Sequence, residues 1–137
     1  MVSMKTLVGA GLAALPSASA YIYGMEAPAT AVAGSTIKAN LMTASYVQNY
    51  IDYSVVWGIA SAGGGSCAPD VCIGTQIGYQ SFYPEQVPLG NFTVDVTIPK
   101  DTPAGDKVLT AAIPYLVGAS GSTSVIAFNA TIAITAA

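Results

Sequence analysis

One stretch of the chain, residues 91–117, constrains the fold more than any other. Its first part alternates strictly between apolar and polar side chains, and the apolar members are Phe92, Val94, Val96 and Ile98. A period of two places the two kinds of side chain on opposite faces of a β-strand. Pro99 ends this strand because proline lacks the N–H group that a sheet ladder uses. Turn-forming residues follow at 101–106, and the apolar run at 108–117 predicts a second strand, central in its sheet.

The rest of the chain repeats this pattern of short strands and turns. Further strands are predicted at 21–27, 36–41, 53–59, 73–83 and 124–135. Together these make about seven strands, the number that a small immunoglobulin-like sandwich requires. We therefore predict an all-β fold, a small antiparallel immunoglobulin-like β-sandwich. One short helical turn stays open as an alternative at 46–53, where Tyr46, Asn49, Tyr50 and Tyr53 share one helical face.

The inward faces of these strands predict one core between two sheets. Its expected members are Trp57, Val94, Val96, Ile113, Phe128 and Ile132. Trp57, the only tryptophan, falls in the third predicted strand, where immunoglobulin-type sandwiches often keep a core tryptophan. The turn before the central strand resembles the corner of such sandwiches, but Lys107 stands where a tyrosine is common. The tyrosine-corner hydrogen bond is therefore not expected.

The first 20 residues carry the three marks of a secretory signal peptide in the right order. Lys5 gives a positively charged start, an apolar run follows at 7–15, and small residues at 18–20 form a cleavage site. The run is roughly half of the ~20 residues that span a bilayer, so no membrane span is expected. Residues 1–20 are predicted to be a signal peptide, and 21–137 a single domain. The C-terminal end alternates and keeps polar residues, so free secretion is expected rather than a lipid anchor.

The composition of the chain excludes several classes of function. With four lysines and arginines in total, and none of them arginine, the chain lacks the basic surface that a nucleic acid requires. The absence of histidine excludes Ser-His-Asp and Cys-His nucleophiles and histidine-bound zinc or copper. We therefore predict no catalytic residue, no metal and no cofactor, and we expect that the protein is not an enzyme.

The seven carboxylates give little support to acid–base catalysis. Most are expected in turns or on outward faces, and none in an apolar run that raises its pKa. They are Glu26, Asp52, Asp70, Glu85, Asp95, Asp101 and Asp106. Glycoside hydrolysis needs two carboxylates at a defined separation across a cleft. We expect the side chains of these carboxylates to be solvated. An alternative is that Asp101 and Asp106 share a calcium ion, but two carboxylates alone are weak evidence for such a site.

Two features typical of secreted proteins are predicted outside the core. Cys67 and Cys72 are the only cysteines, and an even pair in a secreted chain indicates a disulfide. Four residues separate them, whereas a redox-active pair has two, so a structural bond that shapes a surface loop is favoured. Asn91 and Asn129 each begin an Asn-x-Thr sequence, which makes both predicted glycosylation sites.

Tyrosines give the strongest indication of a binding surface. Four residues in the connection between two predicted strands are expected to contact a partner, namely Tyr46, Asn49, Tyr50 and Tyr53. Loops rich in tyrosine and asparagine are frequent in protein recognition surfaces. The alternative is that these rings cap an end of the core. A second aromatic cluster at 79–83 carries the same two interpretations.

The predicted domain resembles a known family over nearly all of its length. The segments that carry the resemblance are 22–28 (IYGMEAP), 33–37 (AGSTI), 44–49 (ASYVQN), 57–59 (WGI), 77–79 (IGY), 91–94 (NFTV), 98–105 (IPKDTPAG) and 114–119 (PYLVGA). In this order they are similar to the necrosis-inducing secreted protein family of fungi. The resemblance implies a small secreted effector that is associated with plant cell death. It also implies binding to receptor-associated kinases of the host and suppression of immune signalling, without catalytic residues.

Two hypotheses of different class follow. The first is a monomeric, non-enzymatic effector that acts at or in host cells by binding a host plant protein. The second is a cell-wall or glycan-binding module in which Tyr21, Tyr23, Tyr79 or Trp57 stacks on a sugar. Burial distinguishes them, because sugar-binding aromatics form an exposed, coplanar row and a core tryptophan does not.

Overall fold

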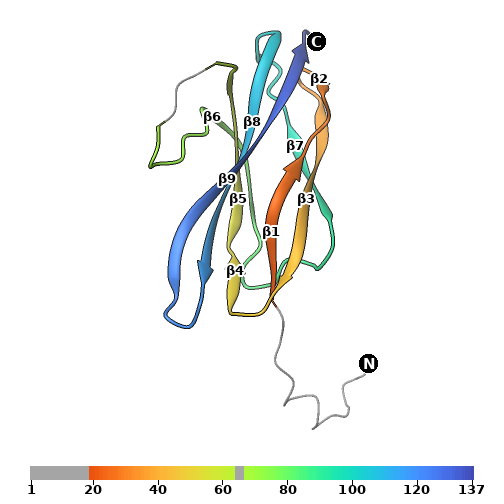
Figure 1. Ribbon diagram of the computed structural model, residues 1–137. Helices are drawn as coiled ribbons and strands as arrows, with labels where there is room; N and C mark the ends of the chain where they lie inside the picture. Colours follow the sequence, from red (N-terminus) through yellow and green to blue (C-terminus); the bar gives the residue numbers. More distant parts are fainter. Residues whose placement is uncertain (1–18, 64–66) are drawn as a thin grey trace, which may run out of the picture.

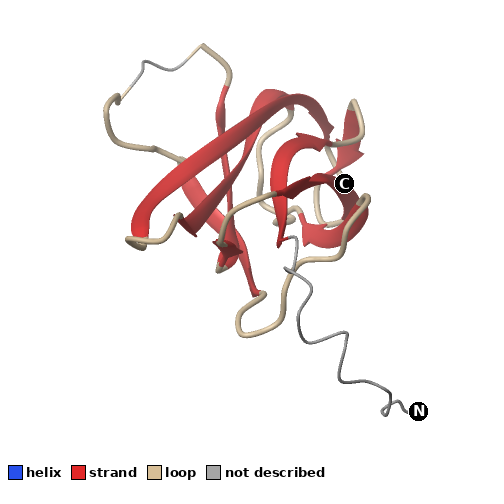
Figure 2. Ribbon diagram, turned by 60° about the horizontal axis from the view of Figure 1, so that its bottom comes forward, coloured by secondary structure: helices blue, strands red, loops and turns tan. Residues whose placement is uncertain are grey.

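A computed structural model describes residues 19–63 and 67–137, in which nine β-strands occur. In chain order they are β1 (Ser19–Glu26), β2 (Thr30–Val32), β3 (Thr36–Tyr46), β4 (Tyr50–Asp52), β5 (Ser54–Ser61), β6 (Thr75–Ser81), β7 (Phe92–Thr97), β8 (Gly105–Val117) and β9 (Ser122–Thr135). No helix lies within the described ranges, so the connection at 46–53 is not a helical turn (Figure 2). Residues 1–18 of the predicted signal peptide lie outside the described residues, and the signal peptide stays a prediction.

The strands form two sheets that pack face to face (Figure 1). The smaller sheet has the order β1-β3-β7, and the larger has the order β2-β9-β8-β5-β6 with β4 paired to β8. Immunoglobulin sandwiches carry strands A, B and E in one sheet and G, F, C and C′ in the other. The strands β1, β3 and β7 take the first set of places, and β9, β8, β5 and β6 take the second. The all-β, immunoglobulin-like prediction is confirmed, with nine strands in place of about seven.

The two additional strands are three residues each. β2 pairs in parallel with β9, so the sandwich is not wholly antiparallel as predicted. β4 pairs antiparallel with β8 and replaces the loop expected between Tyr46 and Tyr53. Three residues are too few to show a period of two, which is why the sequence pattern did not indicate either strand.

One hydrophobic core fills the space between the sheets. Five of the six predicted core residues are buried, and these are Trp57, Val94, Val96, Ile113 and Ile132. Phe128 is partly buried and packs against them, so the predicted core is confirmed. Trp57 lies on β5, the place of strand C, with 1% of its surface exposed. At the start of β8, Lys107 Nζ donates to Ser61 Oγ at 3.3 Å in the position where a tyrosine corner would stand.

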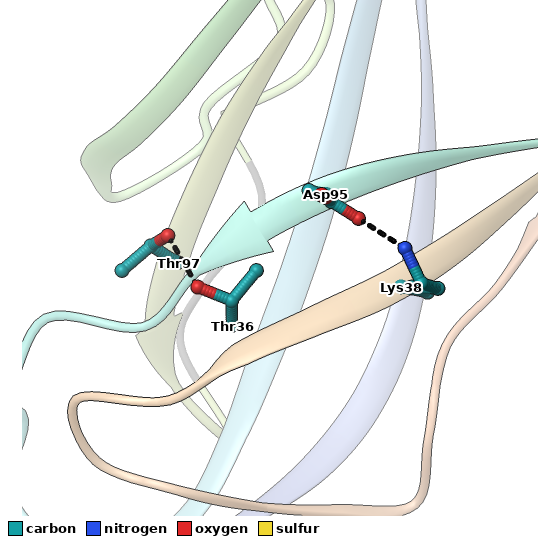
Figure 3. A network of polar contacts seen from close by, with 4 residues as sticks. All are labelled: Thr36, Lys38, Asp95 and Thr97. Atoms are coloured by element: carbon teal, nitrogen blue, oxygen red, sulfur yellow. Dashed lines mark hydrogen bonds and ion pairs between the residues drawn. The ribbon is translucent and has the colours of Figure 1, made fainter.

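The outer face of the smaller sheet meets water through paired polar side chains. We call the four residues Thr36, Lys38, Asp95 and Thr97 the polar ladder (Figure 3). Lys38 and Asp95 form an ion pair at 2.8 Å, and the hydroxyls of Thr36 and Thr97 lie 2.9 Å apart. In the register of β3 and β7, Thr36 lies directly opposite Thr97 and Lys38 directly opposite Asp95, so each pair can interact across the two strands.

Candidate functional site

Five tyrosines from four strands gather where the chain passes from β3 into β4, at the lower end in Figure 1. We call this group the tyrosine cluster, and it consists of Tyr21, Tyr23, Tyr46, Tyr50 and Tyr115. Tyr50 is its centre. The centroid of its ring lies 5.3 Å from that of Tyr21, 5.1 Å from that of Tyr46 and 5.3 Å from that of Tyr115. These separations fall within the range at which aromatic pairs attract one another.

The cluster has a buried floor and a more exposed rim. Tyr50 is 7% exposed and stacks on Tyr115 with 3° between the ring planes, which forms the floor. Burial raises the pKa of the Tyr50 phenol, with a further contribution from Asp52. Tyr21 and Tyr46 are half-buried, and Tyr23 is 50% exposed at the edge. Other tyrosines already pack against the Tyr50 ring and leave little of it exposed, and its contact with a partner stays a prediction.

Beside the cluster, residues 47–49 form a short loop with one exposed apolar side chain. Val47 is 95% exposed, and the exposed polar residues Gln48 and Asn49 follow it. The loop is held in place because Gly118 N donates to Asn49 O at 2.9 Å, which joins it to the β8–β9 turn. Gly118 has φ +85°, a conformation that favours glycine at this contact. Val47 was missed by the sequence reasoning, although an apolar residue inside a polar, tyrosine-rich loop was the available signal.

Asp52 lies beneath the cluster and connects the two sheets. Its Oδ2 accepts a hydrogen bond from Ile22 N of β1 at 3.0 Å, and 3% of its surface is exposed. Desolvation raises the pKa of this carboxyl to about 6, although the Ile22 hydrogen bond acts in the opposite direction. The expectation that no carboxylate is buried is therefore wrong for Asp52. A carboxyl with this little exposure has no access to a substrate, and its contact is a structural link between β1 and β4.

Tyr53 does not join the tyrosine cluster. Its ring is half-buried and packs against Tyr83, with the two centroids 5.3 Å apart. Its carbonyl oxygen accepts hydrogen bonds from the backbone N–H groups of Phe82 and Tyr83, at 2.9 and 3.2 Å. The four predicted contact residues therefore lie in two places. Tyr46, Asn49 and Tyr50 lie at the cluster and its loop, and Tyr53 lies with the 82–91 connection.

The aromatic residues of the glycan-binding hypothesis do not form one surface. Trp57 is in the core, which removes it from any stacking role. Tyr79 is exposed on β6 of the larger sheet, whereas Tyr21 and Tyr23 lie on β1 of the smaller one. The rings of Tyr21 and Tyr23 are inclined by 55° to each other. The described aromatics thus provide no coplanar, exposed row for a sugar chain.

At the opposite end of the sandwich, the connection from β5 to β6 contains the predicted disulfide. Cys67 and Cys72 are bonded, with 6.1 Å between their Cα atoms. Their loop returns across β5, where a Cβ atom on Gly58 would lie 2.2 Å from Ile73 O. Gly58 is therefore required for this close approach.

Asp101 lines a groove of about 330 Å³ nearby, and in the described part of the chain no three acidic or cysteine side chains group as metal ligands.

The two predicted glycosylation sites lie on different surfaces. Asn91 is exposed in the connection directly before β7. Asn129 is exposed on β9, where its Oδ1 accepts a hydrogen bond from Thr110 Oγ1 at 2.9 Å. Both remain predicted sites. No helix in residues 19–63 and 67–137 has the length and hydropathy to cross a membrane.

Together, the fold and the site define a class: a small immunoglobulin-like module with a cluster of tyrosines and an exposed loop at one end. The model of the Nis1 family matches residues 18–133 of the chain. Two relatives from fungi of the genus Colletotrichum are both named necrosis-inducing secreted protein 1. The chain is 38% identical to that of C. higginsianum over 128 residues, which cover 91% of the chain and 84% of the relative.

The second relative, from C. orbiculare, is 35% identical over 130 residues, which cover 93% of the chain and 77% of the relative. The chain belongs to the Nis1 family. This confirms the resemblance to the necrosis-inducing secreted protein family of fungi. It also confirms the predicted extracellular localisation, because the named relatives are secreted proteins.

Proposed function

We propose that this protein is a secreted effector that induces necrosis in plant tissue by binding host immune-signalling proteins. The observation that carries this proposal is the 35–38% identity, over most of the chain, to relatives named for necrosis induction. The receptor-associated kinases are the partners that the family resemblance implies. Binding suppresses their signalling, induces cell death, or has both effects.

The tyrosine cluster and the 47–49 loop are the surface proposed for this contact. Tyrosine rings bury a large area at low entropic cost and keep a hydroxyl for hydrogen bonding. The stack of the buried Tyr50 ring on the half-buried Tyr115 ring holds the rim in position before a partner arrives, which lowers the free-energy cost of binding. The charged residues of the chain amount to 8%, so we expect affinity to depend weakly on salt.

A non-enzymatic mechanism fits the chemistry of the chain. Histidine is absent from the sequence, and the buried carboxyl of Asp52 is engaged with the backbone of β1. Binding alone requires shape and exposed anchors, and both are present at the tyrosine cluster. The loops at this end correspond to the B–C and F–G loops, which immunoglobulin variable domains also use for recognition.

Affinity capture combined with leaf infiltration tests the proposal. The secreted protein is immobilised, exposed to a plant extract and washed, and retained proteins are identified by mass spectrometry. We expect receptor-associated kinases among the retained proteins, and necrosis where the same protein is infiltrated into leaves. Retention of cell-wall polysaccharide without a host protein, or infiltration without necrosis, would contradict the proposal. Heat-unfolded protein is the control for non-specific adhesion.

A further inference from the structure

The outer face of the larger sheet carries a patch of small apolar side chains. We call this patch the apolar face, and it consists of Val56, Val108, Ala112, Pro114, Val125 and Ala127. Strand register places Val56 beside Ala112, Ala112 beside Ala127, and Pro114 beside Val125. The outer face of an antiparallel sandwich is ordinarily polar, as the polar ladder is on the smaller sheet. Val125 is 44% exposed, Val56, Val108, Pro114 and Ala127 are half-buried, and Ala112 is buried. Apolar side chains that stay partly open to solvent on an outer face favour a further cover.

Two shallow grooves lie between the apolar face and the loop that contains the Cys67–Cys72 disulfide. Their volumes are about 410 Å³ and about 610 Å³. Asp70, Val71 and Ile73 of the loop line both grooves, and strands β5, β8 and β9 provide the base. Asp70 is the only charged residue among the described residues that line them. The occupant of this surface therefore needs no charge.

Asn129 stands within this surface. It lines the smaller groove and follows Ala127 on the same face of β9. Across the sheet it pairs with Thr110, whose buried hydroxyl donates to Asn129 Oδ1 at 2.9 Å. This hydrogen bond uses the amide oxygen and leaves Nδ2 available. Nδ2 is the atom to which a glycan is attached, and Thr131 completes the acceptor sequence.

We infer that an N-linked glycan on Asn129 covers the apolar face, and that the sugars nearest the protein occupy its grooves. In the attachment reaction, Nδ2 forms a bond to the anomeric carbon of a lipid-pyrophosphate-linked oligosaccharide. The bond from that carbon to the pyrophosphate oxygen breaks, the lipid pyrophosphate leaves, and one amide proton passes to a base of the transferase. The Thr110 hydrogen bond persists afterwards because it uses Oδ1.

The chemistry of the surface favours this occupant over a protein. N-acetylhexosamines present C–H faces and an acetyl methyl group, which suit a surface of small aliphatic side chains without charge. A glycan rooted between Thr110 and Ala127 would also obstruct a protein partner from reaching the patch. The apolar face is thus solubilised by the chain's own modification, and the tyrosine cluster stays open.

Removing the acceptor sequence in two ways tests this inference. Four proteins are secreted from a glycosylating yeast: the wild type and the variants Thr131→Ala, Asn129→Gln and Asn91→Gln. They are compared by intact mass, by binding of a hydrophobic dye and by light scattering after size exclusion. Thr131→Ala removes the glycan but keeps the Asn129–Thr110 hydrogen bond. We expect a glycan on Asn129 of the wild type. Both variants at this site should gain dye fluorescence and shift towards dimers or larger species.

Asn91→Gln is the matched control, since it removes a predicted glycan at a distance from the apolar face. It should keep the dye fluorescence and the scattering mass of the wild type. The inference is overturned if secreted wild type is unmodified at Asn129, or if Thr131→Ala loses a glycan without change in either readout. Capture of a plant protein by Thr131→Ala but not by the wild type would also overturn it, because the patch would then be a protein-binding surface.

Discussion

The tyrosine cluster and the apolar face both expose apolar surface on one sandwich, yet they are built differently. The cluster has large rings on a buried floor, with Val47 projecting beside them at 95% exposure. The apolar face is made of small side chains on regular strands, with a glycan acceptor, Asn129, among them. The difference teaches that exposed apolar surface has two uses here. We propose that the raised, supported aromatic surface anchors a partner and that a glycan covers the flat patch with the acceptor asparagine.

The comparison assumes that the tyrosine cluster and the apolar face are supported by the same hydrophobic core. The variant Trp57→Ala should have the largest effect on that core. Trp57 is almost fully buried between the sheets, so its truncation should cost about 3–5 kcal/mol of unfolding free energy. A loss of this size is a large fraction of the stability of a small domain. Urea unfolding monitored by circular dichroism gives the value. An unchanged midpoint would show that Trp57 is not a core residue.

The distinction between floor and rim inside the tyrosine cluster is tested by a matched pair of tyrosine variants. Tyr50→Ala opens a cavity beneath three rings and should cost about 2–4 kcal/mol. Tyr23→Ala removes a half-exposed ring and should cost less than about 1 kcal/mol. Urea midpoints of the two variants measure the difference. Equal costs would remove the distinction between floor and rim.

Asp52, at the tyrosine end, makes the stability of the domain depend on pH. Its pKa is about 6 in the folded protein against an ordinary 3.8, so the folded state favours the neutral carboxyl. The resulting stability is fully present below about pH 4 and is lost as pH rises through 6, on the order of 2–3 kcal/mol. Asp52→Asn keeps an acceptor for Ile22 N and should flatten this dependence. Thermal melts from pH 4 to pH 7 measure it, and parallel curves for the two proteins would contradict the account.

The smallest effect is expected at the polar ladder, the solvated counterpart of the apolar face. Lys38 and Asp95 are largely exposed, and exposed ion pairs contribute about 0–1 kcal/mol. Lys38→Ala should therefore change the urea midpoint slightly, and the wild-type value should approach that of the variant at high salt. A large, salt-independent loss would mean that this face depends on the pair for its fold.

The sequence was sufficient for the parts of the fold that depend on long periodic strands. Alternation in β7 and β9 located the core, and Ile113, Ile132 and Val96 lie where the pattern predicts. The short strands β2 and β4 were not predicted, because they pair with residues more than 60 positions away in the chain. The pattern of neighbouring residues contains no information about such distant contacts.

The candidate site was predicted in part for the same reason. Tyr46 and Asn49 were identified from composition, but the roles of Tyr50 and Asp52 follow from a three-residue strand that turns both side chains inward. Tyr115 joins the cluster through the pairing of β4 with β8. Burial of a carboxyl against Ile22 N, which lies 30 residues away in sequence, has no local signature.

Two exposed valines provide the most direct test of the central claim that the tyrosine end binds the host partner. Val47 lies beside the tyrosine cluster and Val125 on the apolar face, so Val47→Asp and Val125→Asp place the same charge on the two regions. The dissociation constant of each glycosylated variant is measured by surface plasmon resonance against the host protein that the capture experiment identifies. We expect Val47→Asp to weaken binding by about tenfold or more, the size of an anchor residue's effect, and Val125→Asp to leave it unchanged. Unchanged binding by Val47→Asp, or weakened binding by Val125→Asp, would contradict the account.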